Sequence, residues 1–433
     1  MTTLIRNLEI LTLDAEGRRL ECADLVVEGG RITHLGEAPA TLRADEVIDG
    51  TGRVALPGLF NSHCHASMTF ERGVAEDMAF PEWLPAVWKI ENVLSADDVY
   101  WGAALATIEM IKTGCVGFND MYFHMDRVAD AVRESGMKAA LGETVFDPGE
   151  GSAVGDALGK ALTWNADMAA ESHPRLRVYL APHSPYTCSQ PLLEEVVAAA
   201  HDTGRGIHTH LSEDQRQVDQ SLERYGMTPV QHLESIGAFE VPGGLVAAHT
   251  LVVDERDLEI LEERRVRVPH CPITYAKLAM PMFSLAPFFE RGVTVGLATD
   301  GPASNADMDL FAVMRQTALL QKYLSLDPGA VPGDTLLRMA TSVGAEIAGF
   351  PESGRIEVGA PADLILVRTD VAHMTPRHDL VANLVHSAKG ADVTDAMVDG
   401  QWLMRNRELV TLDEEKIVAE AQARAEALVE RAR

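Results

Sequence analysis

The sequence lacks the features of several classes of protein. Lys and Arg together number 37 against 65 Asp and Glu, so the formal net charge is −28. Such a polyanion repels nucleic acid and anionic lipid at long range. No apolar run approaches the ~20 residues that a membrane helix needs, and the first residues lack the basic start and apolar core of a signal peptide. We therefore expect no nucleic-acid partner and no membrane partner.

Cysteine is also scarce. The five cysteines are odd in number and widely spaced, which argues against a disulfide framework or a Cys-rich zinc site and suits a reducing cytoplasm. Neither a GxGxxG nor a P-loop motif is present. The 46% hydrophobic and 24% charged residues, in a chain of 433, are typical of a globular cytoplasmic protein of enzyme size. The cysteines are Cys22, Cys64, Cys115, Cys188 and Cys271.

Two β-rich ends enclose a different middle. Residues 1–56 and 351–412 both alternate short apolar stretches with Gly, Pro and Asp turn signals. Strands from both chain ends are therefore predicted to form one small β-sandwich domain. Residues 413–433 have helical periodicity with charges throughout, which predicts a helix at the surface or at an interface.

The middle, residues 57–350, alternates strand-like and helix-like segments. Seven apolar segments are candidate strands, and an eighth strand ends before His63. Two of the helical patterns between them close on Gly, as a C-cap would. Eight strand-then-helix units predict an α/β fold of the (β/α)8 TIM barrel type, with a doubly wound open sheet as the alternative. The seven segments are 116–120, 139–143, 177–183, 206–210, 245–249, 266–270 and 293–300.

Polar residues gather where the predicted strands end. In a barrel enzyme the carboxyl ends of all strands open onto one mouth, where the chemistry takes place. The chain contains 15 histidines, and composition alone does not explain how many of them fall at these ends. The residues expected at this rim are His63, His65, His183, His208, His210, His249, His270 and Asp300.

Four rim residues are candidate metal ligands. Residues i and i+2 of an extended segment point the same way, so His63 and His65 can reach one ion. In the second such pair, His210 is better placed than His208 because it lies closer to the loop. With Asp300 they offer three nitrogens and a carboxylate, which Zn²⁺ accepts while keeping a position for water. The alternative is four unrelated strand-end residues.

Three residues are candidates for moving protons. Glu213 follows His210 by three positions and could accept a proton from water and pass it to the departing group. Alternatively, Glu213 is an acid stabilised at the start of a helix by the helix dipole. His249 could polarise the water or the forming tetrahedral centre, or could be a core histidine. Asp300 could be both a ligand and a second proton acceptor.

Several motifs resemble a known superfamily. LPGLFNSHCH, HTHLSE, AAHT, PHCP and ATDGPASN look like the amidohydrolase superfamily, in that order and over nearly the whole chain. MTFERGVAEDMAFPEWL, VWKIE, FNDMYFH, APHSPY and GRIEVGAPADLILV resemble the deaminases of adenosine, methylthioadenosine and S-adenosylhomocysteine. The chlorohydrolases and deaminases of s-triazine compounds share much of this pattern.

The resemblance implies roles for individual residues. His63, His65, His210 and Asp300 would bind one zinc ion, with iron as the lesser possibility, because the strand ending in APH has no lysine that could bridge two ions. Glu213, His249 and Asp300 would move protons. The substrate-binding residues would be Glu91, which would bind both ribose hydroxyls, His183, His270 and Trp88, which with Trp83 could form a lid or belong to the core. A homo-oligomer is expected from family habit only.

The chain departs from the family pattern in two places. S-adenosylhomocysteine deaminases hold the amino-acid carboxylate with arginines after the third strand. This chain has no arginine between Arg133 and Arg175, and Glu143 stands in that region. After His270 the family usually has a Ser-Asn pair, whereas this chain has CPITYAKL. Both changes argue against S-adenosylhomocysteine as the preferred substrate.

These observations predict a metal-dependent hydrolytic deaminase of an amino-substituted nitrogen heterocycle, of the adenosine or methylthioadenosine type. Glu213 would protonate a ring nitrogen, and ammonia would leave after proton delivery from Asp300. In one alternative the same site hydrolyses a different bond, by dechlorination or amide hydrolysis of a related ring such as an s-triazine. The remote alternative is a non-catalytic metal-binding barrel.

Overall fold

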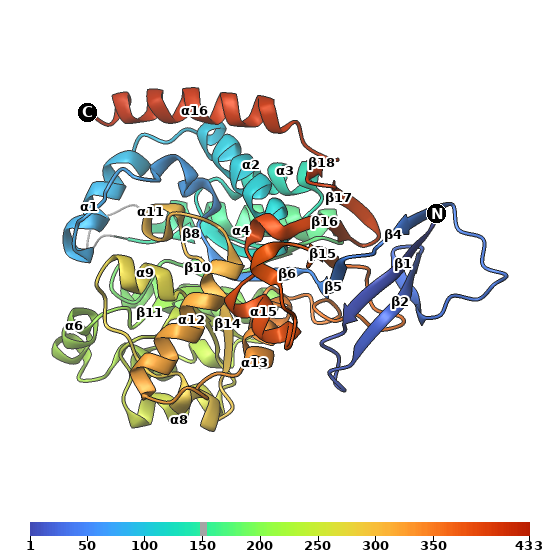
Figure 1. Ribbon diagram of the computed structural model, residues 1–433. Helices are drawn as coiled ribbons and strands as arrows, with labels where there is room; N and C mark the ends of the chain where they lie inside the picture. The colour runs from blue at the N-terminus through green and yellow to red at the C-terminus, as the bar shows by residue number, and fades with distance from the viewer. Residues whose placement is uncertain (148–153) are drawn as a thin grey trace.

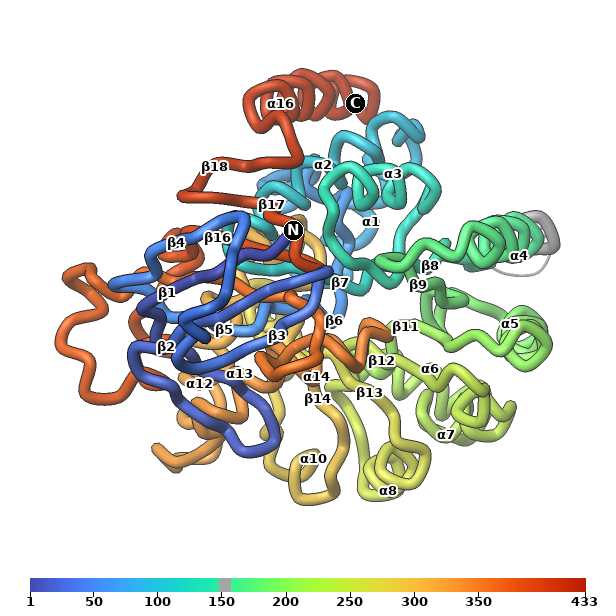
Figure 2. Tube along the Cα trace, turned by 90° about the vertical axis from the view of Figure 1, so that its right-hand side faces the viewer, coloured from blue at the N-terminus to red at the C-terminus, as the bar shows by residue number. Residues whose placement is uncertain are grey.

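The computed structural model of the protein describes residues 1–147 and 154–433. Its centre is a ring of parallel strands with eight positions in the described part of the chain, seen end-on in Figure 2. The fourth position is divided between two short strands. The strands are β6 (Leu59–Cys64), β7 (Cys115–Tyr122), β8 (Lys138–Val145), β9 (Leu176–Val178) with β10 (Ala181–Pro182), β11 (Ile207–Leu211), β12 (Leu245–His249), β13 (Arg267–His270) and β14 (Thr294–Leu297).

Two short bridges close the ring into a barrel. Strands β6 to β10 pair as one parallel group, and β11 to β14 pair in sequence order as another. Parallel bridges between Leu180 and Ile207 and between Cys64 and Asp300 join the two groups. The predicted (β/α)8 barrel is therefore confirmed, and the open sheet is excluded. The second bridge also brings the segment after β14 against the end of β6, which matters for the site.

Helices surround this barrel. The two predicted Gly C-caps are present, since Gly136 and Gly204 have φ of 78° and 69° after α3 and α5. The helices that follow barrel strands are α2 (Ala96–Lys112), α3 (Met125–Ser135), α4 (Val154–Glu171), α5 (Gln190–Thr203), α6 (Gln215–Tyr225), α7 (Pro229–Ser235), α8 (Glu255–Glu263), α9 (Pro272–Lys277), α10 (Ala286–Glu290), α11 (Pro302–Asn305), α12 (Leu310–Ser325), α13 (Gly333–Ala340) and α14 (Ser342–Ile347), with the 3₁₀ turn η2 (Ala238–Glu240).

Strands from both chain ends form one nine-stranded sheet with a hydrophobic core of its own. The antiparallel pair β5–β15 joins the N-terminal strands to the C-terminal ones. The sheet lies on one side of the barrel in Figure 1. Its strands are β1 (Thr2–Leu11), β2 (Arg19–Glu28), β3 (Arg31–Gly36), β4 (Glu46–Asp49), β5 (Arg53–Pro57), β15 (Leu364–Arg368), β16 (Val393–Val398), β17 (Gln401–Arg405) and β18 (Glu408–Leu409); between β15 and β16 lie η3 (Ala372–Met374), α15 (Leu380–His386) and η4 (Gly390–Asp392).

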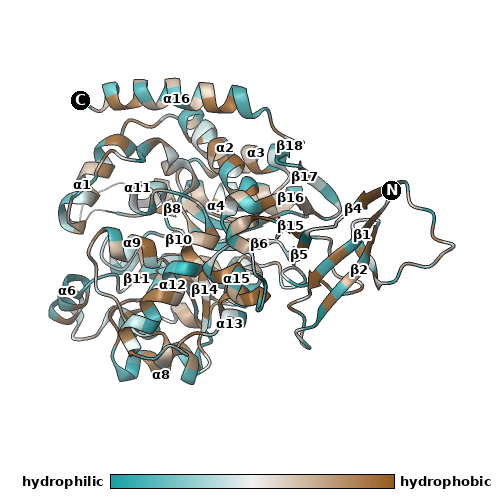
Figure 3. Ribbon diagram, viewed as in Figure 1, coloured by the Kyte–Doolittle hydropathy of each residue, from teal (hydrophilic) through white to brown (hydrophobic). Residues whose placement is uncertain are grey.

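The last helix, α16 (Glu414–Arg431), runs along the outside of the molecule over η1 (Ala66–Glu71), α1 (Phe80–Glu91) and α2, as Figure 1 shows. Apolar and polar residues alternate along it in Figure 3. Its buried Leu428 belongs to a small cluster with Phe70 of η1 and Ile90 of α1. The helix thus holds α1, which carries Glu91, against the barrel. None of the described helices is long and apolar enough to cross a membrane.

Candidate active site

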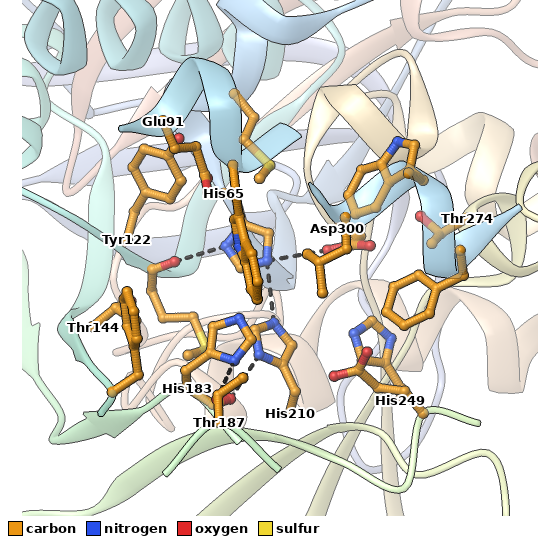
Figure 4. A pocket seen from close by; sticks show the side chains of 18 of the residues that line it. His65, Glu91, Tyr122, Thr144, His183, Thr187, His210, His249, Thr274 and Asp300 are labelled. Atoms are coloured by element: carbon orange, nitrogen blue, oxygen red, sulfur yellow. Dashed lines mark hydrogen bonds and ion pairs between the residues drawn. The ribbon is translucent and has the colours of Figure 1, made fainter. Parts of the chain in front are cut away.

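Four strand ends bring four histidines and an aspartate together. His63 and His65 come from the end of β6, His210 and His249 from β11 and β12, and Asp300 follows β14. The Asp300 carboxylate oxygen Oδ1 lies 3.4 Å from His63 Nε2 and 3.3 Å from His65 Nε2. His65 Nε2 lies 3.2 Å from His210 Nε2. Figure 4 shows His65, His210, His249 and Asp300 around one pocket.

The Nδ1 atoms of His63, His65 and His210 contact groups on the outer side of the cluster. His65 Nδ1 is 2.7 Å from the Met121 carbonyl, and His210 Nδ1 is 2.8 Å from the His183 carbonyl. His63 Nδ1 is 2.9 Å from Nε2 of the buried His208. These contacts orient each Nε2 toward the centre of the cluster, as outer partners do for the imidazole ligands of a metal. His208 therefore lies behind the cluster, and its partner His210 lies in it.

Burial sets the charge of this cluster. Burial lowers the pKa of His63 to about 4 and of His249 to about 3, and that of His210 well below its usual value. Burial alone would raise the pKa of Asp300, but its contacts with His63 and His65 hold it well below the usual range. Burial opposes the charged form of His65, yet Asp300 raises its pKa to about 9. Neutral imidazoles and an ionised carboxylate are the forms that bind a divalent metal.

The donor atoms fit one ion. They form two overlapping groups, His63 with His210 and His249, and His63 with His65 and Asp300, and within each group the atoms lie within 4.8 Å of one another. His63 Nε2 and His249 Nδ1 are buried with no hydrogen-bond partner. Buried polar atoms without a partner are costly. A divalent cation among them would remove this cost, so the residues present fit a metal.

The backbone is strained at two of these residues. His249 and Asp300 have φ of 71° and 65°, a left-handed conformation that is uncommon outside Gly and costs on the order of 1–3 kcal/mol. The next residue, Gly301, has no room for a side chain, because a Cβ atom there would lie 2.3 Å from Met68 Sδ and 3.3 Å from His65 Cβ. The ATDG motif thus allows Asp300 to approach His65 closely.

Glu213 lies beside this cluster. It is 4% exposed, and its Oε1 has no hydrogen-bond partner. Burial, and then the charge of Asp300, raise the pKa of Glu213 to about 8. Its backbone N–H donates to the Gln217 side chain (3.0 Å) in the first turn of α6. Glu213 can therefore hold a proton near neutral pH and release it, as a general acid and base must.

A pocket opens in front of the cluster. Glu91 and Trp88 of α1, with the buried Trp83, form part of its wall, and His183 forms another part. His183 Nδ1 is 2.8 Å from Thr187 Oγ1, which fixes the ring. The structure thus brings together, around one pocket, the residues predicted from four strand ends and from α1.

Some expected neighbours lie elsewhere. His270 does not belong to the described residues that line the pocket: it is 1% exposed, with its ring against Tyr275 and Phe283. In the CPITYAKL segment Thr274 lines the pocket, whereas Lys277 points to Glu76, 2.7 Å away. The His270 ring therefore packs against aromatic side chains instead of lining the pocket with the other predicted rim residues.

Tyr122 was not among the predicted site residues, although it lines the pocket. Its hydroxyl oxygen lies 3.1 Å from Oε1 of the buried Glu71. Asp120 is also buried, and burial raises its pKa to about 7. All three lie in the MTFERG and FNDMYF motifs, so the signal was an acid or phenol inside an otherwise apolar stretch. The sequence does not show which face of β7 Asp120 and Tyr122 occupy.

An outer pocket continues from the inner one past Trp88 and Glu91. Glu143 lines it and accepts backbone N–H groups of His124 (3.2 Å) and Met125 (2.7 Å), so it caps α3. Residues 148–153, within the segment that lacks arginine, lie outside the described residues. The charged residues that line this outer pocket are Glu91, Glu143, Asp147, Lys160 and Arg224, with His124.

Comparison with known proteins identifies similar chains. A model of the amidohydrolase family matches residues 54–403. The 5-methylthioadenosine/S-adenosylhomocysteine deaminase of Dictyoglomus thermophilum is 44% identical over 401 residues, which cover 92% of this chain and 93% of that protein. A crystal structure of an adenosine deaminase from Xanthomonas campestris with bound zinc has a TM-score of 0.93 at 29% identity, covering 99% and 98% of the two chains. The atrazine chlorohydrolase from Arthrobacter aurescens TC1 complexed with zinc has a TM-score of 0.89 at 26% identity, covering 98% and 100%.

Proposed function

The chain belongs to the amidohydrolase family and is a hydrolytic deaminase, and we propose that it removes the amino group of an adenine nucleoside with one zinc ion bound. The observation that carries this proposal is the convergence of oriented imidazoles, Asp300 and the unpartnered Glu213 on one side of a pocket that carries Glu91 on another. The 5-methylthioadenosine/S-adenosylhomocysteine deaminase and the zinc-bound adenosine deaminase support the nucleoside and the zinc, respectively.

His63, His65, His210 and Asp300 would hold the zinc ion, with His249 beside it. When bound, the metal would lower the pKa of water from 15.7 toward about 7 and so supply a nucleophile at neutral pH. The protein contributes the fixed orientation of its ligands, through the Met121 and His183 carbonyls and His208. Ser304 Oγ donates to Asp300 Oδ2 at 2.7 Å, which leaves Oδ1 to face the histidines.

The protons would move through Glu213 and Asp300. Because the pKa of Glu213 is about 8, its carboxyl is protonated at neutral pH and can give its proton to a ring nitrogen of the base. The carbon that bears the amino group then becomes tetrahedral as water adds to it. Asp300, the more acidic of the two, would take the proton of the attacking water and pass it to the amino group, which leaves as ammonia.

Glu91 would select a ribose. A carboxylate can accept hydrogen bonds from both hydroxyls of a vicinal diol, and Glu91 lines both the inner and the outer pocket. The 5′ substituent would then extend into the outer pocket, between Trp88, Phe123 and Phe146. Carboxylates outnumber Lys and Arg on that wall. An uncharged 5′ group such as methylthio is therefore favoured over the homocysteine carboxylate.

The chlorohydrolase match supports a second candidate, hydrolysis of a substituted s-triazine. Ammonia and chloride release from one panel would separate the two. The panel contains adenosine, 5′-deoxyadenosine, methylthioadenosine, S-adenosylhomocysteine, adenine, an aminotriazine and a chlorotriazine. We expect ammonia from methylthioadenosine and adenosine, with lower kcat/KM for S-adenosylhomocysteine. Turnover of triazines alone would refute the nucleoside assignment.

The role of Glu91 is tested by Glu91→Ala. Loss of two hydrogen bonds to a charged group should raise KM for methylthioadenosine by about a hundredfold, at about 1.5 kcal/mol for each bond. Glu143→Ala, in the outer pocket, is the matched control and should leave adenosine turnover unchanged. An unchanged KM in Glu91→Ala would contradict the ribose contact while leaving deamination intact.

A further inference from the structure

Two buried carboxyl groups meet at one phenol on the wall of the pocket. Glu71, at the end of η1, is 1% exposed, and its Oε1 lies 3.1 Å from the Tyr122 hydroxyl. The carboxyl group of Glu91 also lies close to this hydroxyl, which partly offsets the rise that burial causes in the pKa of Glu91. Figure 4 shows Glu91 directly over the Tyr122 ring. Tyr122 therefore lies between an acid that faces the pocket and one that does not.

This cluster has little positive charge to balance it. Burial, and then the neighbouring carboxyl of Glu91, raise the pKa of Glu71 well above its usual value, and only the Tyr122 hydroxyl acts in the other direction. Burial also raises the pKa of Glu91, with Tyr122 and the more distant His65 opposing this. Two adjacent buried carboxyl groups without a close cation do not both ionise. One proton must be shared among Glu71, Tyr122 and Glu91.

The position of the three groups decides where the proton lies. Glu71 Oε2 is buried with no hydrogen-bond partner, so an ionised Glu71 would leave a charged oxygen unsolvated. Glu91 faces the pocket, where water or substrate hydroxyls can reach it. The charge is therefore more stable on Glu91. A Tyr hydroxyl donates one hydrogen bond and accepts others, so it can connect a neutral donor on one side to an anionic acceptor on the other.

We propose that Glu71 is a positioning residue, a neutral carboxylic acid that donates its O–H to Tyr122, so that the Tyr122 O–H donates to Glu91 and holds it as an oriented anion. This inference rests on the proposed contact between Glu91 and the ribose hydroxyls. It assigns a function to Glu71, which does not touch the pocket, and it explains why an acid is buried beside another acid. The relay lets Glu91 remain an acceptor in a buried environment that would otherwise protonate it.

The proposal predicts that Glu71 can be replaced only by another hydrogen-bond donor. Gln has the same shape, and its amide N–H can donate to Tyr122, whereas Leu has a similar volume and cannot donate. In Glu71→Gln, KM for adenosine should stay within about twofold of the original enzyme. In Glu71→Leu and in Tyr122→Phe it should rise by about tenfold, the effect of one hydrogen bond to a charged group, with little change in kcat.

A substrate without the diol separates positioning from general damage. For 2′,3′-dideoxyadenosine, KM should be the same in Glu71→Leu, Tyr122→Phe and the original enzyme. If that substrate and adenosine have equal KM in the original enzyme, the proposed ribose contact itself fails. If adenosine is favoured but Glu71→Gln is as impaired as Glu71→Leu, the ribose contact holds and the neutral-donor role of Glu71 is wrong.

Infrared spectroscopy of the zinc-loaded, substrate-free protein gives a readout that does not depend on turnover. At neutral pH the difference spectrum between the original protein and Glu71→Gln should contain the C=O band of a protonated carboxylic acid. The control difference, between the original protein and the exposed Glu259→Gln, should contain only carboxylate bands. A carboxylate band in place of the acid band for Glu71 would overturn the proposal even if Glu71→Leu does not fold.

Discussion

Two buried clusters of charged and polar side chains, at opposite ends of the barrel, differ in one respect. At the lower end of the barrel, Lys138 Nζ lies 2.6 Å from Asp363, 2.9 Å from Asp399 and 3.2 Å from Ser353 Oγ. Arg175 Nε adds a second contact to Asp399 at 2.9 Å. At the mouth of the barrel the cluster of His63, His210, His249 and Asp300 is as deeply buried, yet several of its atoms have no partner.

The Lys138 cluster is paired internally, whereas the mouth cluster has buried atoms without a partner. The Lys138 cluster joins the barrel strand β8 to the β-domain, where Asp363 precedes β15 and Asp399 follows β16. Its opposite charges satisfy one another, so it has nothing left to bind. The mouth cluster contains imidazole nitrogens and a carboxylate oxygen held toward a common centre, and a ligand would satisfy its unpaired atoms. Unpartnered buried atoms that gather toward one centre distinguish the mouth cluster from the Lys138 cluster.

The largest effect is expected for Glu213→Gln, beside the mouth cluster. We expect kcat to fall by about 10³–10⁴-fold, because general acid–base catalysis contributes up to that amount. Stability should not fall, since the substitution removes a buried carboxyl oxygen that has no partner. Steady-state kinetics, thermal melting and metal analysis would be measured together. A kcat within tenfold of the original, with metal still bound, would show that Glu213 is not the proton carrier.

At the Lys138 cluster, a substitution should reduce stability and leave activity unchanged. Lys138→Met should reduce the free energy of unfolding by about 3–5 kcal/mol, because it leaves Asp363 buried and unpaired. The folded enzyme should keep its kcat/KM. Urea denaturation measures the loss, with the exposed pair of Arg256 and Glu259 (3.0 Å) as control, where Arg256→Met should cost less than about 1 kcal/mol. If Lys138→Met impaired turnover more than stability, the division between the two clusters would be wrong.

A smaller effect is expected from zinc binding, which tests whether the unpaired atoms of the mouth cluster need a bound ligand. Zinc added to the chelator-treated protein at a hundred times its Kd should stabilise it by about 2.7 kcal/mol, by linkage. Thermal melting at several zinc concentrations measures this shift, and Lys138→Met should show the same increment. His63→Ala should lose most of it, because it removes a donor shared by both groups of candidate ligands. An equal shift in His63→Ala would place the metal elsewhere.

Much of the fold could be predicted from the sequence because its signals are local. Apolar runs that end in Gly, Pro or His define strands, and Gly136 and Gly204 end helices as expected. Because the carboxyl ends of barrel strands share one mouth, predicting the strands also predicted that His63, His65, His210 and Asp300 would meet. The roles of these residues in binding metal and moving protons stay predictions.

The relations between side chains across strands could not be predicted. His208 and His210 have the same sequence signal, and only the packing of β11 against β6 places one behind the cluster and the other in it. His270 is likewise a histidine at the end of an apolar strand, yet its ring is buried beside Tyr275 and Phe283. The contact of Glu71 with Tyr122 joins residues 51 positions apart, and no periodicity in either segment indicates it.

The sequence by itself determined the barrel, the β-domain from both ends and the meeting of His63, His65, His210 and Asp300, because strand period, turn residues and chain order are local properties. Only the tertiary structure decided which nitrogen of each histidine faces the centre, which acid is left unpartnered and which acid lies next to Glu91. Those outcomes depend on distances between segments far apart in the chain, and on how much water each side chain loses when the segments pack.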